Sequence, residues 1–232
     1  MADPTAALET AIYVKLATDA TLAALLPGVE RLVTVTATGG TFTLTYGAAT
    51  TAAIAYNATA ATVQTRLVAL ATVGSGKVTA SGNAGGPWTV TFAAGMVGAL
   101  TGSGTLLTGE GAALSIVQRA SVHNTAIPDK TAYPFAAFQL VGGPPPHNSL
   151  GARTYWEILY QCRVIGEGLR KATILAALSR IDALLERADL TVSGATVKAI
   201  LRDAPLPAMS EVTAGTVFQQ VGASWRFWVQ ET

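Results

Sequence analysis

Charge is distributed very unevenly along this chain, and that unevenness limits the folds open to it. Residues 1–31 carry six charged side chains, residues 32–118 carry three, and residues 119–232 carry twenty. The middle block also holds fourteen of the 23 glycines. Such a composition is typical of a low-complexity linker, but apolar and polar residues alternate through this block in an ordered way. We therefore expect residues 32–118 to form a separate β-rich module, inserted into a discontinuous domain made of residues 1–31 plus 119–232.

The clearest pattern inside the module is a strict alternation of threonines with Phe42, Leu44 and Tyr46. A period of two residues predicts a strand with one buried face. Asn57 or Thr59 is placed to cap a helix whose apolar residues recur at helical spacing. The module should thus be a small hairpin–helix–hairpin unit, whereas the glycine-rich residues from 93 to about 115 show little pattern. Its expected elements are strands at 41–46, 53–56, 78–80 and 88–92 and a helix over about 60–71.

The flanking segments read as one α+β domain. Leu8, Ile12 and Leu16 recur one helical turn apart, and Asp19 or Thr18 can cap a second short helix that Pro27 ends. Four strands and one long helix then follow, so we expect an antiparallel sheet with its helices packed on one side. These elements are strands at 135–141, 156–164, 197–202 (Val197, Ala199 and Leu201 alternating with Lys198, Ile200 and Arg202) and 217–229 (Gly222 a possible bulge), and a helix over about 170–187.

Composition argues against several functional classes. A net charge of +1, with 12% charged residues, disfavours a basic groove for nucleic acid. The single cysteine, Cys162, excludes an internal disulfide and a Cys-rich zinc site, and it should be a buried, unreactive thiol. His147 near Ser149 lacks an orienting acid, and His123 is expected to be a solvated loop residue. We expect no enzyme and no cofactor.

Neither a membrane-spanning segment nor a secretion signal is expected. Uncharged stretches are interrupted by glycine, and the first residues carry Asp3 without a basic region. The protein should therefore be soluble and made in a cytoplasm. Asp182 and Glu186, one turn apart on the long helix, are expected to lie on a solvated surface with neighbouring basic residues.

Several residues are candidates for contacts with other subunits. The polar connection 142–153 is expected to be a stiff extended hairpin tip, which could also serve as an arm that docks on a neighbouring subunit. Charged residues alternate on the outer face of the strand at 156–164, either as ordinary solvated surface or as a subunit contact. Trp228 falls opposite the expected buried face of the last strand, which hints at packing against a helix or a partner. The interface candidates are Pro145, His147, Arg153, Glu157, Arg163 and Trp228.

With the flanks joined, five segments stand in a recognisable order and spacing: Leu8–Leu26, Tyr133-Pro-Phe-Ala-Ala-Phe138, Arg153–Val164, Leu184-Leu-Glu-Arg187 and Phe227-Trp-Val-Gln230. Through them the chain resembles the tail-terminator (tail-completion) proteins of long-tailed bacteriophages. The resemblance covers about 145 residues, 1–31 plus 119–232. The module departs from that family; through Gly39–Tyr46, Ile54–Gln64 and Pro87–Phe92 it is similar to Thr/Gly/Ala-rich modules of other phage structural proteins.

The resemblance implies a structural role without catalysis. Members of that family form a ring, commonly of six copies, on the head-proximal end of the tail tube. The ring stops tube polymerisation and offers a surface to the head-completion protein. The implied partners are further copies of this chain, the tail tube protein and a head-completion or neck protein, with no membrane and no specific nucleic acid. The implied location is the head–tail junction of the virion, after assembly in the host bacterial cytoplasm, with the module projecting outside the ring.

Two alternatives stay open at this point. The chain could be another neck component, such as a head-completion or stopper protein, because these are also small α+β ring-formers. It could also be a carbohydrate-binding or host-adhesive module, if aromatic rings of the inserted block stack on sugars. Those rings are Phe42, Tyr46, Tyr56, Trp88 and Phe92.

Overall fold

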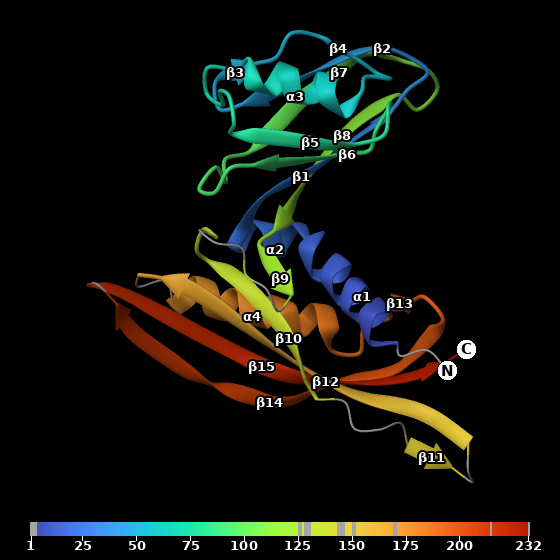
Figure 1. Ribbon diagram of the computed structural model, residues 1–232, viewed down its shortest axis with the longest axis vertical. Helices are drawn as coiled ribbons and strands as arrows, with labels where there is room; N and C mark the ends of the chain where they lie inside the picture. The colour runs from blue at the N-terminus through green and yellow to red at the C-terminus, as the bar shows by residue number, and fades with distance from the viewer. Residues whose placement is uncertain are drawn as a thin grey trace. The chain divides into compact units, whose positions relative to one another are not determined.

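A computed structural model describes residues 4–124, 127, 131–142, 147–149, 152–168, 171–213 and 215–231, without the side chains of 147–149, 152–154 and 231. The chain divides into two compact units, one of Met1–Pro27 with Ala120–Thr232 and one of Gly28–Arg119 (Figure 1). The range 32–118 lies within the second unit, which also takes in residues 28–31 and Arg119. Each unit has its own hydrophobic core.

The first unit contains a seven-stranded sheet in the order β13-β14-β15-β12-β10-β9, with β11 paired to β12. Its pairings are antiparallel except that of β9 with β10, which is parallel. The elements of this unit are α1 (Thr5–Ala17), α2 (Ala20–Leu25), β9 (Val122–Asn124), β10 (Phe135–Gly142), β11 (His147–Ser149), β12 (Ala152–Glu167), α4 (Lys171–Leu185), β13 (Thr191–Val192), β14 (Ala195–Thr213) and β15 (Thr216–Glu231).

The helices of this unit pack against one face of the sheet, which confirms the expected α+β class (Figure 1). The apolar stripe of α1 is buried, as is that of α4, against inward-facing residues of β12 and β15 such as Trp225 and Phe227. Asp19 caps α2, since its carboxylate accepts a hydrogen bond from the Leu22 N–H at 2.7 Å. The same carboxylate binds Arg180 of α4 at 2.6 Å, so the cap also ties two helices together.

Strand β14 is much longer than the expected strand at 197–202. Pro205 and Pro207 argue against a central strand, because proline cannot donate to a ladder. Beyond Thr196, however, β14 pairs only with β15 among the described residues, so its prolines lie at a sheet edge. The expected alternation is also wrong: a register shift after Val197 leaves Ile200 buried and Leu201 40% exposed.

The bulge expected at Gly222 is wrong as well. Gly222 pairs in unbroken register with Arg163 of β12, and the nearby register shift falls between Leu206 and Met209 of β14. A Cβ atom at Gly222 would lie 2.5 Å from the carbonyl oxygen of Cys162. Glycine is therefore required here by the close approach of two strands.

The second unit contains two four-stranded sheets and one helix. One sheet has the order β5-β6-β1-β8, and in the other β2 lies between β3 and β4 and also pairs with β7. Helix α3 begins after Thr59, whose hydroxyl accepts from the Thr62 N–H at 3.3 Å. The elements are β1 (Pro27–Thr36), β2 (Gly39–Tyr46), β3 (Ala49–Thr50), β4 (Ile54–Ala55), α3 (Ala60–Val68), β5 (Val78–Gly82), β6 (Trp88–Phe92), β7 (Leu100–Thr108) and β8 (Ala113–Ala120).

The hairpin–helix–hairpin expectation for this unit is incomplete. The expected strands and helix are present, and β2 pairs with β4 as a hairpin would. Strands β1, β3, β7 and β8 were not expected. In β7 the glycines serve close packing, because a Cβ at Gly102 would lie 2.5 Å from the carbonyl oxygen of Thr43 on β2. A glycine-rich segment without a clear pattern is thus an ordered strand.

The chain leaves and rejoins the first unit at neighbouring points. The Ser121 N–H donates to the Leu26 carbonyl at 2.7 Å, within the first unit. Inside the second unit, the side-chain amide of Gln118 donates to the Gly28 carbonyl at 3.3 Å. An insertion whose ends lie this close together leaves the host fold able to close without it.

Candidate interaction surface

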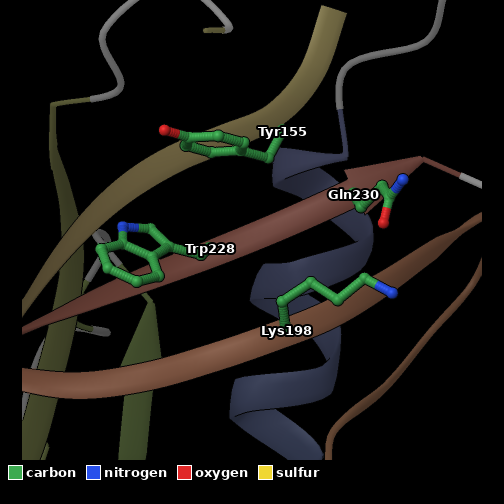
Figure 2. A pocket seen from close by; sticks show the side chains of 4 residues that line it. All are labelled: Tyr155, Lys198, Trp228 and Gln230. Atoms are coloured by element: carbon green, nitrogen blue, oxygen red, sulfur yellow. The ribbon is translucent and has the colours of Figure 1, made fainter. Parts of the chain in front are cut away.

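The face of the seven-stranded sheet opposite the helices, here called the outer face, carries three of the six sequence-predicted interface residues, Glu157, Arg163 and Trp228. At one end of it Trp228 is 38% exposed, and its ring centroid lies 6.5 Å from that of Tyr155. These two rings line a shallow hollow of about 370 Å³ together with Lys198 and Gln230. Figure 2 shows the four side chains standing on β12, β14 and β15. We call this set the aromatic hollow.

The middle of the outer face holds an ion network across three strands. The guanidinium of Arg226 on β15 binds the carboxylate of Glu157 on β12 and that of Asp203 on β14, the latter at 2.7 Å. The hydrogen bond to Asp203, followed by that to Glu157, raises the pKa of Arg226 above its ordinary value. Glu157, a candidate for contacts between subunits, thus already has a partner within its own sheet.

The remaining candidates lie on or near the same strand. Arg163 is half-buried on β12 opposite Gly222, and its Nη1 atom is buried without a hydrogen-bond partner among the described groups. Arg153 and His147 belong to the antiparallel pairing of β11 with β12, which lies within the connection expected to form a hairpin tip. Pro145 lies outside the described residues, as do the side chains of His147 and Arg153. The interface role of all six candidates stays a prediction.

At the far end of β14 and β15 lies a second exposed region that the sequence analysis missed. We call residues Met209–Thr213 with Thr216–Gln220 the hairpin tip. Met209 is 52% exposed and Val212 is 67% exposed. The outer side of the tip borders a second hollow of about 380 Å³, in which the Phe218 ring lies 5.3 Å from that of Tyr133. The sequence does contain a signal for this region, because Met209 and Val212 lie on either side of Ser210-Glu211, shortly after two prolines.

Three other residues that the sequence analysis singled out have structural roles. Cys162 is buried in the sheet, and burial raises the pKa of its thiol to about 12. His123 lies on β9 and not in a loop, with its Nε2 atom 3.1 Å from the Ser121 hydroxyl, so the solvated-loop expectation is wrong. Asp182 binds Arg202 at 2.6 Å, while burial is the main cause that raises the pKa of its carboxyl.

The described part of the chain holds no cluster of three His, Cys, Asp or Glu side chains suited to a metal ion. It also contains no helix with the length and apolarity needed to cross a membrane.

The aromatic rings of the second unit mostly form its core. Phe42 and Trp88 stack with centroids 5.7 Å apart, and Tyr46 stacks on Phe92 at 4.6 Å. All four are at least nine-tenths buried, whereas Tyr56 is only partly buried. These four rings are therefore not accessible for stacking on a sugar, which leaves Tyr56 alone of the five candidate rings partly exposed.

Fold and surface together define a mixed α+β protein with helices on one face of its main sheet and an uncovered, aromatic-bearing face on the other. No family model matches the chain. A stretch of 72 residues, 31% of the chain, is 49% identical to the tail sheath protein of Mycobacterium phage Bxz1 and spans 12% of that protein. A chain in the virion of a native gene transfer agent particle is similar over 47% of this chain and 78% of its own length, with 19% identity and a TM-score of 0.37.

Proposed function

We propose that this chain is a structural protein of a phage virion. The supporting observation is the 72-residue stretch that is 49% identical to a phage tail sheath protein. Within the virion, we assign it to a ring on the head-proximal end of the tail tube, where it ends tube polymerisation and offers a surface for head attachment. The resemblance of the joined flanks to tail-terminator proteins supports this more specific role.

The uncovered outer face is the structural observation that carries the ring proposal. A subunit of a ring must present different surfaces to its neighbours and to the parts above and below it. Here the helices cover one face of the seven-stranded sheet, while the other keeps Trp228 and Tyr155 more than one-third exposed. Exposed aromatics grouped on a sheet are typical of protein contact surfaces.

The chemistry of the site fits assembly better than catalysis. The only thiol is held protonated at neutral pH, because burial raises the pKa of Cys162 to about 12. In the middle of the outer face the Arg226 guanidinium binds the carboxylates of Glu157 and Asp203, which holds these three side chains in place. A ring protein needs such a rigid surface and no reacting group.

The test is binding to purified tail tubes. Tubes assembled with the protein should be capped at one end and stop growing, and gold-labelled protein should mark that end in electron micrographs. Labelled protein found only on the head side, without contact to tubes, would favour another neck component. Protein that leaves tube growth unchanged and labels neither structure would contradict the proposal. A Trp228→Ala variant should cap tubes less well than an Ile127→Ala variant, a control exposed apolar residue elsewhere in the first unit.

A further inference from the structure

We propose that copies of this chain associate head to tail, with the hairpin tip of one copy seated in the aromatic hollow of the next. This inference rests on the proposed function, because it specifies the contact through which the ring would close. It commits to a second copy of this chain as the occupant of the hollow.

The aromatic hollow is built to receive an apolar group next to an acidic one. Tyr155 and Trp228 are 39% and 38% exposed, and their neighbouring rings form an open apolar floor. Lys198 is exposed at the same hollow, and no carboxylate is among the described residues that line it. An apolar side chain placed on the rings would bring a neighbouring carboxylate within reach of the Lys198 ammonium group.

The hairpin tip has the complementary character. Met209 and Glu211 point to the same face of β14, because they lie two residues apart in a strand of regular register, whereas Val212 points to the opposite face. Met209 is 52% exposed, and a methionine sulfur makes favourable contacts with aromatic rings. The Glu211 carboxylate accepts a hydrogen bond from the Thr213 hydroxyl at 3.1 Å. The tip therefore offers an apolar surface with one negative charge to a hollow that has an apolar floor and one positive charge.

The tip is also ordered before it binds. Its strands pair in regular register from Met209 opposite Gln220 to Thr213 opposite Thr216. The Gln220 amide further donates to the Met209 sulfur at 3.3 Å. A segment already held in its strand loses little conformational entropy on docking, which favours affinity.

The two surfaces cannot meet within one chain. Lys198 and Glu211 lie on the same strand, thirteen residues apart by number, and a strand rises about 3.3 Å per residue, so they are separated by roughly 40 Å. A tip that fills the hollow therefore belongs to another copy. A contact between two different patches allows head-to-tail repetition, which is the kind of interface that closes rings.

Charge reversal tests the proposal. The wild-type protein should form a closed oligomer in sedimentation velocity as its concentration is raised. Lys198→Glu and Glu211→Lys should each weaken this association at least tenfold, because each places like charges at every contact. An equimolar mixture of the two variants should regain the wild-type oligomer, because the reversed hollow of one then meets the reversed tip of the other.

Matched controls separate this contact from a general effect of charge. Lys77→Glu and Glu110→Lys make the same charge changes at exposed positions of the second unit. They should assemble like the wild type, singly and mixed. All four variants should keep the wild-type melting temperature, since each side chain is exposed.

Three results would overturn the inference: a wild-type protein that stays monomeric at every concentration, variants that assemble normally, or a mixture that fails to recover. Its failure can be distinguished from failure of the proposed function. If the protein caps tubes and the charge reversals have no effect on its assembly, the proposed function stands and this contact is refuted. If the protein assembles through this contact but does not bind tube ends, the contact stands and the tail-terminator role is refuted.

Discussion

Replacing Gly222 with alanine should destabilise the first unit, because the added Cβ atom would clash with a neighbouring strand. Gly222 lies in the middle of β15, opposite Arg163 of β12 and Leu206 of β14. An added Cβ would lie 2.5 Å from the Cys162 carbonyl oxygen and 3.0 Å from Cδ1 of Leu206. The leucine methyl group can move aside, but the carbonyl belongs to the backbone of a central strand.

The size of the effect follows from two opposing contributions. Overpacking typically costs about 1–3 kcal/mol, and a backbone clash belongs at about 2–3 kcal/mol. Replacing glycine by alanine also restricts the unfolded chain, which returns about 0.5–1 kcal/mol. The free energy of unfolding should therefore fall by about 1–2.5 kcal/mol. For a protein of this size that lowers the melting temperature by about 3–8 °C.

Thermal unfolding followed by circular dichroism measures this directly, with Gly142→Ala as the control. Gly142 lies at the end of β10, and a Cβ there would have no heavy atom within 4 Å. The control should melt at the wild-type temperature or slightly above it. At roughly 3 °C per kcal/mol, a difference of 1 °C corresponds to about 0.3 kcal/mol. If Gly222→Ala and Gly142→Ala melt within about 1 °C of each other, the close approach of β12 and β15 is not what requires glycine at position 222.

Three further predictions concern other parts of the molecule. Asp19→Ala should cost about 1–2 kcal/mol at pH 7, because it removes the α2 cap and the bond to Arg180. Since the bond to Arg180 lowers the pKa of Asp19, the difference from wild type in urea titrations should be full above about pH 4 and shrink as the pH falls through the lowered value. Cys162 should not react with a thiol reagent in the native protein at pH 8 and should react fully in urea; fast native labelling would show that it is accessible. Replacing residues 28–119 by a short Gly/Ser linker should leave a folded, soluble first unit with a cooperative melt, because Leu26 and Ser121 are already hydrogen-bonded; an insoluble product would mean that the units fold together.

Local sequence signals were sufficient for the helices of the first unit. In α4 the apolar residues Ile174, Leu178 and Ile181 recur at helical spacing, and all are buried. The α2 cap was also predictable, because Asp19 immediately precedes the helix and its side chain reaches the third residue on. Periodicity and capping act within a few residues, so they can be read without knowledge of the fold.

Features that depend on strand pairing could not be predicted in this way. The extension of β14 past Pro205 is possible only because that stretch lies at a sheet edge, which the sequence does not reveal. Strand β7 was missed for a similar reason, since Gly102 weakens its pattern but permits the close approach of β2. A bulge after Val197 then reverses the alternation that sequence reasoning assumed.

In the candidate surface, too, local sequence predicts some features, whereas others depend on strand pairing. The outward position of Trp228 was predictable, because a strand alternates its side chains and the neighbouring Trp225 and Phe227 belong inside. The pairing of Glu157 with Arg226 was not, because it joins residues far apart in sequence through the register of β12 and β15. The hairpin tip escaped notice because its exposed Met209 gains meaning only once β14 is seen to reach it.

The edge strand β14 favours assembly through the outer face over assembly by addition of a strand from another copy. An unpaired edge strand invites another chain to extend the sheet, which leads to open-ended aggregates. Over the middle of β14 that route is hindered by Pro205, by Pro207 and by three register shifts. A copy that cannot add a strand along this edge can still seat side chains on the face beside it. Contacts of that kind are limited to two defined patches, which allows a ring to close and assembly to stop.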